Sequence, residues 1–204
     1  PLSVNWIAQN VQALVQAWEP GALGGCALAN ILAGKVNPSA KLPISIPRHS
    51  GQIQMIYNHK PSQYFHKYID GPSTPLYPFG FGLSYTRFAY SSLKLSHTRI
   101  SDKDSFTASI ELTNVGDREG TEVVQLYIRD IYSSATRPVK ELKDFARVTL
   151  KPGEKKTVTF TVTPDKLAYW NRNMQYGVEK GEFEIMIGSS SQDKDLKKVK
   201  MEVL

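Results

Sequence analysis

Apolar residues at the start of the chain recur at intervals of three and four. They are Trp6, Ile7, Val11, Leu14, Val15 and Trp18. This spacing predicts an amphipathic helix that ends at Pro20-Gly21. A second, shorter helix is expected over residues 22–33, where Gly34 and Asn37-Pro38 close it.

The second predicted helix is rich in small residues, among them Gly24, Gly25 and Ala29. Small side chains let another backbone approach closely, so we expect this helix to pack against a neighbour outside these 204 residues. Its predicted buried side carries Leu23, Ala27, Leu28, Ile31 and Leu32.

Two different segments follow this helix. "KLPISIP" (residues 41–47) predicts a short strand bracketed by prolines. Residues 48–75 show no clear period, and an ordered loop of that length usually lies near a functional surface.

From about residue 86 the apolar positions alternate with polar ones, as in strands with one buried face. The alternation is clearest over residues 106–113, 123–128, 157–162 and 182–187, and further strands are expected near residues 88–95, 146–150 and 199–203. Turn-forming segments such as "NVGDREG" and "KPGEK" separate them. This pattern predicts an immunoglobulin-like β-sandwich, and the missing Cys–Trp–Cys signature favours a fibronectin type III-like variant.

Between the two regions lies the aromatic segment, residues 74–88, "TPLYPFGFGLSYTRF". Aromatic side chains in polar loops can stack on sugar rings, and they can also seal a junction between domains. The prolines stiffen this segment, while the glycines permit close backbone approach. We favour the junction, with Phe79, Phe81, Leu83 and Tyr85 buried on both sides of the boundary.

The charge of the chain points to no nucleic-acid partner. The formal net charge is +6, and the densest basic cluster is "KDLKKVKMEV" (residues 194–203). Its lysines alternate with Val199, Met201 and Val203, which is typical of the solvent face of an edge strand and not of a nucleic-acid site.

No membrane partner is predicted, because no apolar run approaches the roughly 20 residues needed to cross a bilayer. No leader sequence is recognisable, and the chain opens with Pro1 instead of Met. We therefore expect the numbering to begin partway through a longer polypeptide, which leaves the compartment open. The single cysteine, Cys26, excludes an internal disulfide and is interpreted as a buried small hydrophobe, with a nucleophile as the alternative.

Residues with catalytic or ligating chemistry are sparse. The four histidines (His49, His59, His66 and His97) do not have metal-ligand spacing, and no phosphate-binding loop or Gly-x-Ser-x-Gly elbow is present. Glu19 and Asp70 are the acids of the first region and could in principle form a glycosidase pair. Both precede turn-forming residues, so we interpret them as turn residues. We assign no catalytic, cofactor-binding or metal-binding residue to this chain.

Taken together, several motifs resemble the C-terminal portion of glycoside hydrolase family 3, the family of β-glucosidases and β-xylosidases. In order, they are "VNWIAQNVQALVQAWEPGALGG" (4–25), "ILAGKVNPSAKLPISIPR" (31–48), "GQIQMIYNHK" (51–60), "PLYPFGFGLSYTRF" (75–88), "GTEVVQLYIRD" (120–130) and "RPVKELKDFARVTLKPGE" (137–154). The family usually has Gly where Ala40 stands, which implies a turn here without positive φ, and an aromatic residue where Glu19 stands.

The resemblance implies three parts: a TIM-like barrel, an α/β sandwich domain and a fibronectin type III-like domain. Residues 1–85 would be the C-terminal segment of the α/β sandwich domain, and residues 86–204 the fibronectin type III-like domain. It further implies retaining hydrolysis of β-linked sugars, with an aspartate nucleophile in the barrel and a glutamate acid/base earlier in the α/β domain. Both acids would lie on segments outside this chain, so we expect the isolated 204 residues to be inactive.

The resemblance therefore implies a parent enzyme that hydrolyses terminal, non-reducing β-D-glucosyl or β-D-xylosyl residues, without a cofactor. Its partners would be a β-linked oligosaccharide or glycoside, and the barrel and the remainder of the α/β domain on the same or a separate chain. Tyr57, Tyr64, Phe65 and Tyr68 could reach the rim of its active site, or they could tether the loop. The alternative function is a non-catalytic carbohydrate-binding or adhesion module of the fibronectin III type.

Overall fold

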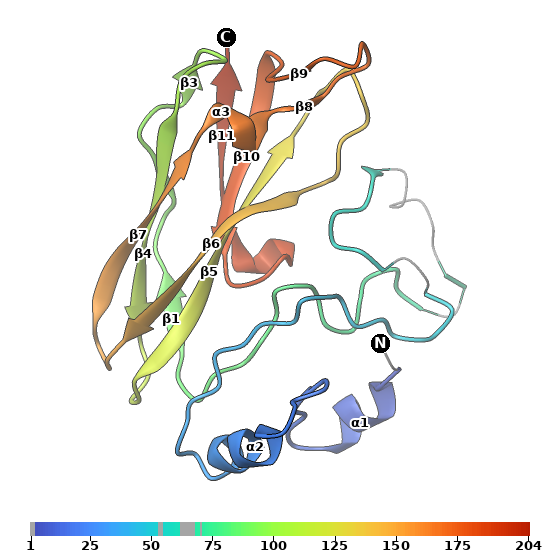
Figure 1. Ribbon diagram of the computed structural model, residues 1–204, viewed down its shortest axis with the longest axis vertical. Helices are drawn as coiled ribbons and strands as arrows, with labels where there is room; N and C mark the ends of the chain where they lie inside the picture. Colours follow the sequence, from blue (N-terminus) through green and yellow to red (C-terminus); the bar gives the residue numbers. More distant parts are fainter. Residues whose placement is uncertain (1–2, 53–54, 62–67, 70) are drawn as a thin grey trace.

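The computed structural model describes residues 3–52, 55–61, 68–69 and 71–204. Figure 1 shows a β-sandwich formed by the second half of the chain, with the helices and irregular segments of the first half at one end and along one side of it. The fold class is thus an α+β segment followed by an all-β domain, as the sequence predicts.

One sheet of the sandwich is built around β4 (Phe106–Asn114). This strand pairs with β7 (Lys155–Val162) on one side and with two short strands, β1 (Phe88–Tyr90) and β2 (Lys94–Leu95), on the other. The sequence predicts one strand over residues 88–95, but the chain leaves the sheet between Tyr90 and Lys94 and returns to β4 further along.

The second sheet has the order β3-β11-β10-β5-β6. Its long strands are antiparallel: β5 (Gly120–Asp130), β6 (Glu141–Leu150), β10 (Gly181–Gly188) and β11 (Leu196–Val203). Strand β3 (Arg99–Ile100) pairs with the end of β11 in parallel. A two-stranded ribbon, β8 (Tyr169–Trp170) and β9 (Tyr176–Gly177), lies beside the upper end in Figure 1.

The core between the sheets follows the alternation in the sequence. In β4 every second residue from Phe106 to Leu112 is buried, and in β7 Val158, Phe160 and Val162 are buried. Because successive side chains of a strand point to opposite faces, this pattern fixes which face of each sheet points inward. The facing sheet contributes Val124, Leu126, Ile128, Phe183, Ile185 and Ile187 to the same core.

Strand β5 buries both of its faces. Tyr127 lies on the side away from the sandwich core and is fully buried, together with Met186 and Leu196. Tyr57, Phe79 and Leu142 pack against this second cluster. The irregular part of the first half therefore covers the outer face of the five-stranded sheet.

In the described part of the first half the helices are short: α1 (Asn5–Asn10) and α2 (Gly24–Leu32). The second half contains α3 (Pro164–Leu167) and the 3₁₀ turn η2 (Asp193–Asp195). The prediction of a helix reaching Trp18 is wrong, because α1 ends at Asn10 and Trp18 has a φ of +51°. Short helices depend on tertiary packing, and α1 has no buried residue. No helix in the described ranges is long and apolar enough to span a membrane.

The predicted strand at residues 41–47 is also wrong as an element. The segment instead runs beside the aromatic segment, with Leu42 bonded to Gly80 and Phe81 and Ile46 bridged to Tyr77. Proline lacks the amide hydrogen that a ladder needs, so Pro43, Pro47 and Pro78 limit this pairing to isolated contacts.

Candidate functional site

The aromatic segment joins the two halves of the chain. The ring of Phe79 stacks on Tyr57 at 4.2 Å between centroids, and Tyr57 meets the edge of Tyr127 at 5.8 Å. The carbonyl oxygen of Phe79 accepts hydrogen bonds from the amide (3.0 Å) and the hydroxyl (2.9 Å) of Ser191. The Phe79 backbone and ring are thus both fixed to the outer face of the five-stranded sheet.

Gly80 makes this contact possible. It has a φ of +79°, and a Cβ atom there would lie 2.1 Å from Oε1 of Gln125. The Gln125 amide donates to the Gly80 carbonyl (3.1 Å) and to the Ser189 carbonyl (2.7 Å), while its oxygen accepts from the Tyr127 hydroxyl (2.6 Å). Glycine is the residue that tolerates both the positive φ and this close approach.

The prediction for the other aromatic-segment residues holds only in part. Phe81 is partly buried and stacks on Tyr77 at 5.4 Å. Leu83, expected at the junction, is 75% exposed, and Tyr85 is 44% exposed with its hydroxyl bonded to the Ile31 carbonyl. The neighbouring Gly82 lies close to the backbone of Ala40, where a Cβ atom would be 2.2 Å from the carbonyl oxygen. Leu83 itself is left mostly uncovered by the described chain.

Asn37, in the "NPSAKLP" motif, connects three segments. Its side-chain nitrogen donates to the Glu119 carbonyl (2.9 Å), and its oxygen accepts from the Tyr85 amide (2.8 Å) and the Ser84 hydroxyl (2.9 Å). The neighbouring Ala40 is not among the residues with positive φ, as its difference from the family's glycine implies. The motif therefore holds these three segments together.

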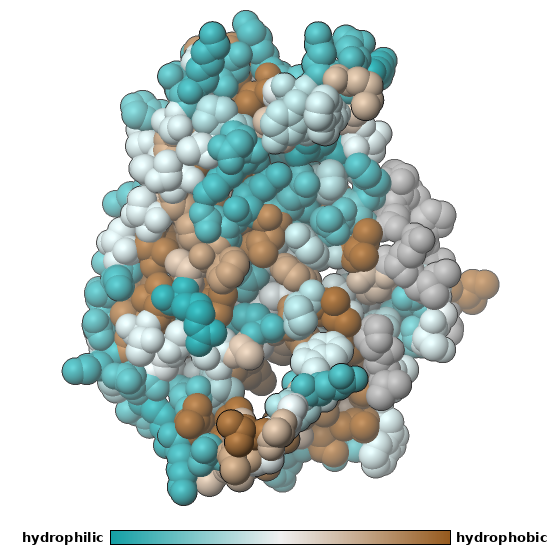
Figure 2. All heavy atoms as spheres, in the orientation of Figure 1, coloured by the Kyte–Doolittle hydropathy of each residue, from teal (hydrophilic) through white to brown (hydrophobic). Residues whose placement is uncertain are grey.

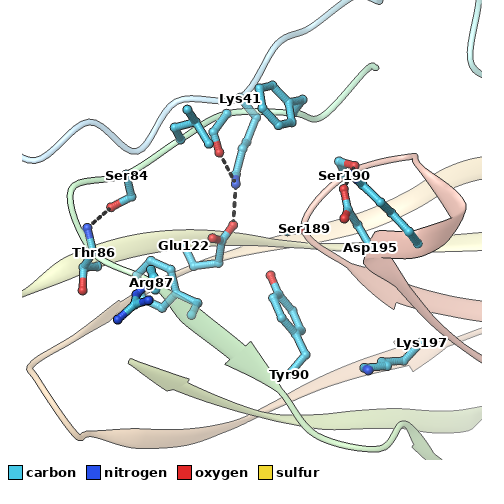
Figure 3. Close-up of a pocket in the computed structure, with 15 residues that line it drawn as sticks. Lys41, Ser84, Thr86, Arg87, Tyr90, Glu122, Ser189, Ser190, Asp195 and Lys197 are labelled. Carbon is cyan, nitrogen blue, oxygen red and sulfur yellow. Dashed lines mark hydrogen bonds and ion pairs between the residues drawn. The ribbon is translucent and has the colours of Figure 1, made fainter. Parts of the chain in front are cut away.

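A hollow of about 440 Å³, lined by both polar and apolar side chains, opens beside this motif, and we call it the junction hollow. Figure 3 shows Lys41 reaching across its upper edge to Glu122 on β5, at 2.8 Å. Burial raises the pKa of Glu122, and the Lys41 ammonium partly offsets this rise. The hydroxyl of Tyr90 points between Glu122 and Asp195 in Figure 3; it is buried and has no hydrogen-bond partner.

The carboxylates of the junction hollow are already bound by their neighbours. Glu122 also accepts a hydrogen bond from the Val123 amide (2.9 Å), and Asp195 accepts from the Ser190 hydroxyl (2.6 Å). A retaining glycosidase needs a carboxylate free to attack the sugar and a second one to protonate the leaving group. The Lys41–Glu122 pair instead fixes Lys41 to the sandwich, and Lys41 also donates to the Gly82 carbonyl at 3.2 Å.

A second hollow of about 300 Å³, the loop hollow, is lined mainly by residues 129–138, at the end of β5 and in its connection to β6, and by Arg172 between β8 and β9. Asp130 at the end of β5 is only 8% exposed, and burial raises its pKa to about 6 despite the nearby Arg137. The Arg137 guanidinium bonds Glu141 and lies over the Tyr169 ring at 4.4 Å. The sequence interpretation missed this cluster, because Asp130, Arg137 and Tyr169 are brought together only by the tertiary structure.

The candidate residues of the sequence interpretation lie only partly in the described part of the chain, and those that do have different surroundings. Glu19 is exposed on the irregular stretch after α1, and Asp70 lies outside the described residues. Tyr57 is fixed at the junction and Tyr68 meets the edge of His49 at 5.1 Å, whereas Tyr64 and Phe65 lie outside the described part. The described residues hold no group of three acidic, histidine or cysteine side chains that could bind a metal.

Cys26 is a further correction, since it is exposed on α2 and not buried. The predicted buried side of this helix is only partly covered: Leu28 and Ile31 are partly buried, whereas Ala27 is exposed, Leu23 is 78% exposed and Leu32 is 72% exposed. With the exposed side chains around α1, Leu23 and Leu32 form what we call the apolar face. Its other members are Trp6, Ile7, Val11, Leu14, Val15 and Trp18, each at least 39% exposed. Figure 2 shows brown, apolar surface at this end of the molecule.

Comparison with known proteins decides the family. Residues 1–85 match the glycosyl hydrolase family 3 C-terminal domain, and residues 122–191 match the fibronectin type III-like domain. The chain belongs to glycoside hydrolase family 3. It corresponds to the C-terminal part of such proteins, since residues 1–85 match the family's C-terminal domain. The chain spans about a quarter of the length of the curated relatives it matches.

The family 3 relatives match along almost the whole chain. A periplasmic β-glucosidase of Salmonella typhimurium is 45% identical over 94% of this chain and 26% of its own length. A β-xylosidase of Formosa agariphila is 45% identical over 100% of the chain and 28% of its own. The solved structure of a β-glucosidase from Erythrobacter marinus matches with a TM-score of 0.95 at 43% identity, over 100% of this chain and 27% of its own.

Proposed function

We propose that this chain is the C-terminal part of a retaining β-glycosidase that hydrolyses terminal, non-reducing β-D-glucosyl or β-D-xylosyl residues. The observation that carries the proposal is the similarity of the whole chain, at 45% identity, to proteins named as a β-glucosidase and a β-xylosidase. In this proposal the two catalytic carboxylates belong to segments outside the 204 residues, and this chain supplies packing surface for them.

The apolar face supports that role. Two tryptophans and several aliphatic side chains are exposed on α1, on α2 and between them, and large apolar patches are uncommon on a free domain. The apolar face is the place where the remainder of the α/β domain would pack. α2, rich in small residues, would permit the close backbone contact that such packing needs.

In this proposal the loop before the aromatic segment has a second role at the active-site rim. Tyr57 is held by Phe79, by Tyr127 and by the Leu142 amide, which donates to its hydroxyl at 3.1 Å, so this residue tethers the loop. Tyr68 is partly buried and remains the rim candidate of the described part. Substituting Tyr64 and Tyr68 by Ala in the whole enzyme is expected to raise KM, and unaltered kinetics would leave only the tethering role.

The proposal is tested by comparing turnover of chromogenic β-glucosides and β-xylosides by the whole protein and by residues 1–204 alone. We expect turnover by the whole protein and none by the isolated chain. Turnover by rigorously purified residues 1–204 would show that the catalytic acids lie on this chain. Absence of turnover by the whole protein, together with retention of the chain on a polysaccharide column, would favour the binding-module function instead.

A further inference from the structure

Asp130 and Arg137 both line the loop hollow, and each carries a polar side-chain atom that the fold leaves unsatisfied. Oδ2 of Asp130 and Nε of Arg137 are both buried and have no hydrogen-bond partner. One is an acceptor and the other a donor. Buried polar groups in folded proteins are almost always paired, and an unpaired one calls for a ligand or an ordered water.

Several other polar groups around the loop hollow are bonded to their neighbours. The Arg137 guanidinium nitrogen Nη2 bonds Glu141, and Arg172 donates to the Ser134 carbonyl at 3.0 Å. The amide and hydroxyl of Ser134 donate to Glu179, at 2.9 and 2.5 Å. These contacts hold the wall of the loop hollow in place, and among its described lining residues Asp130 and Arg137 are the ones with a buried polar atom that has no hydrogen-bond partner.

The charges around the loop hollow argue against an ionic ligand. A cation would meet Arg129, Arg137 and Arg172 in the lining. An anion would meet the buried Asp130, with Glu141 and Glu179 close enough to raise the pKa of its carboxyl group. A hydroxyl group can donate to a carboxylate and accept from a guanidinium N–H at once, so a neutral, hydroxyl-bearing ligand fits both unsatisfied atoms.

The size and the edge of the loop hollow define the ligand further. A single water occupies about 30 Å³ of liquid, so a hollow of about 300 Å³ is larger than one bridging water requires. At its edge the ring of Tyr132 is 77% exposed, which offers an apolar platform beside the polar pair. A pyranose ring has hydroxyl groups on its rim and an apolar face that can pack against an aromatic ring.

We propose that the loop hollow binds one sugar unit of a neutral saccharide, with a hydroxyl between Asp130 and Arg137 and the ring against Tyr132. The site lies on the fibronectin type III-like part, and it would hold a glycan chain independently of bond cleavage. This proposal does not depend on the catalytic function, because the residues that carry it are all on the described chain.

The test is native gel electrophoresis of the whole protein through gels that contain soluble mixed-linkage β-glucan. Each variant is compared with its own mobility in a gel without glucan, which removes the effect of a changed charge. We expect retardation of the wild-type protein, and a loss of affinity of about tenfold in Asp130→Asn, because a hydrogen bond to a charged group is among the stronger ones. Tyr132→Ala should weaken retardation as well, whereas Tyr132→Phe should retain it.

Tyr176→Ala is the matched control, since Tyr176 is a similarly exposed aromatic residue (55%) on β9 that does not line the loop hollow. Its retardation should equal that of the wild-type protein. The proposal is overturned if the wild-type protein is not retarded, which would mean that water alone fills the loop hollow. It is also overturned if neither Asp130→Asn nor Tyr132→Ala changes retardation.

Turnover of a chromogenic β-glycoside, measured on the same samples, separates this proposal from the proposed function. Unchanged turnover with weakened retardation supports a separate binding site. Absence of turnover in every sample would argue against the glycosidase function. The retardation result would still decide whether the loop hollow binds a saccharide. Tyr132 is mostly exposed, so its substitution gives a result even if Asp130→Asn disturbs folding.

Discussion

In the described part of the molecule, the most buried ion pair links a lysine of the first half to a glutamate of the second half. The Lys41 and Glu122 side chains are 12% and 7% exposed, with 2.8 Å between ammonium and carboxylate. Lys41 also donates to the Gly82 carbonyl at 3.2 Å. Removing two charges from water is unfavourable unless each satisfies the other, so neither residue is replaceable alone.

Lys41→Met is therefore expected to destabilise the junction by about 3 kcal/mol, because it leaves Glu122 buried without its partner. Burial already raises the pKa of Glu122, and without Lys41 it should rise further. The double variant Lys41→Met/Glu122→Leu should recover most of the loss. Amide hydrogen exchange of the segments around residues 42–46 and 80–82 measures the opening free energy. Equal losses in the single and double variants would contradict this account.

Asp130 makes stability depend on pH in a defined direction. Its pKa is about 6 in the folded protein against about 3.9 in an unfolded chain, so the folded state binds the proton more tightly. The stability of the sandwich should therefore be greatest below pH 4 as far as this group is concerned, and should fall as the pH rises from 4 to 6.

Asp130→Asn removes this dependence. We expect it to stabilise β5 and β10 at pH 8 by up to about 3 kcal/mol and to have little effect at pH 4, where Asp130 is already neutral. Hydrogen exchange of these strands at the two pH values provides the measurement. An equal effect at both would show that the Asp130 carboxyl is not titrating in this range.

At the scale of elements, β10 and β11 form a hairpin within the five-stranded sheet. Gly188, the last residue of β10, pairs with Leu196 and Gln125, and a Cβ atom there would lie 1.9 Å from the Asp195 carbonyl oxygen. The atom in the way belongs to the backbone, so the movement of a side chain cannot relieve the clash. The hairpin thus needs glycine for close packing and not for an unusual φ.

Gly188→Ala is expected to destabilise the sandwich by more than about 2 kcal/mol, as overpacked sites do. Gly177→Ala on β9 is the matched control, because no atom lies within 4 Å of the added carbon and φ is not positive. That substitution should change stability by less than about 0.5 kcal/mol. Denaturant unfolding followed by hydrogen exchange in β10 distinguishes the two, and a similar small effect in both would contradict the predicted clash.

At the scale of the whole molecule, the two halves differ in how far they complete themselves. The sandwich encloses its own core, which extends along the chain from Leu93 to Val203 at the end of β11. The irregular segments of the first half cover the outer face of the five-stranded sheet, but the apolar face stays uncovered. Its helices are too short to be stable by themselves.

We therefore expect residues 3–36 of the isolated chain to be cleaved quickly by a protease of broad specificity, while residues 106–203 resist. The isolated chain should also bind a hydrophobic dye, and Trp6→Ser should reduce that binding because Trp6 is 71% exposed. In the whole protein residues 3–36 should be protected. Equal resistance of residues 3–36 and the sandwich in the isolated chain would show that the apolar face needs no partner.

The sequence by itself determined the β-sandwich and its inward faces, because alternation is a local property that any pleated strand converts into a buried and an exposed side. Only the tertiary structure decided three other features. The helix predicted to reach Trp18 ends at Asn10, the outer face of β5 is buried under Tyr57 and Phe79, and Asp130 meets Arg137 in the loop hollow. Each depends on which distant segment covers a given side chain, and the order of residues along one element does not contain that information.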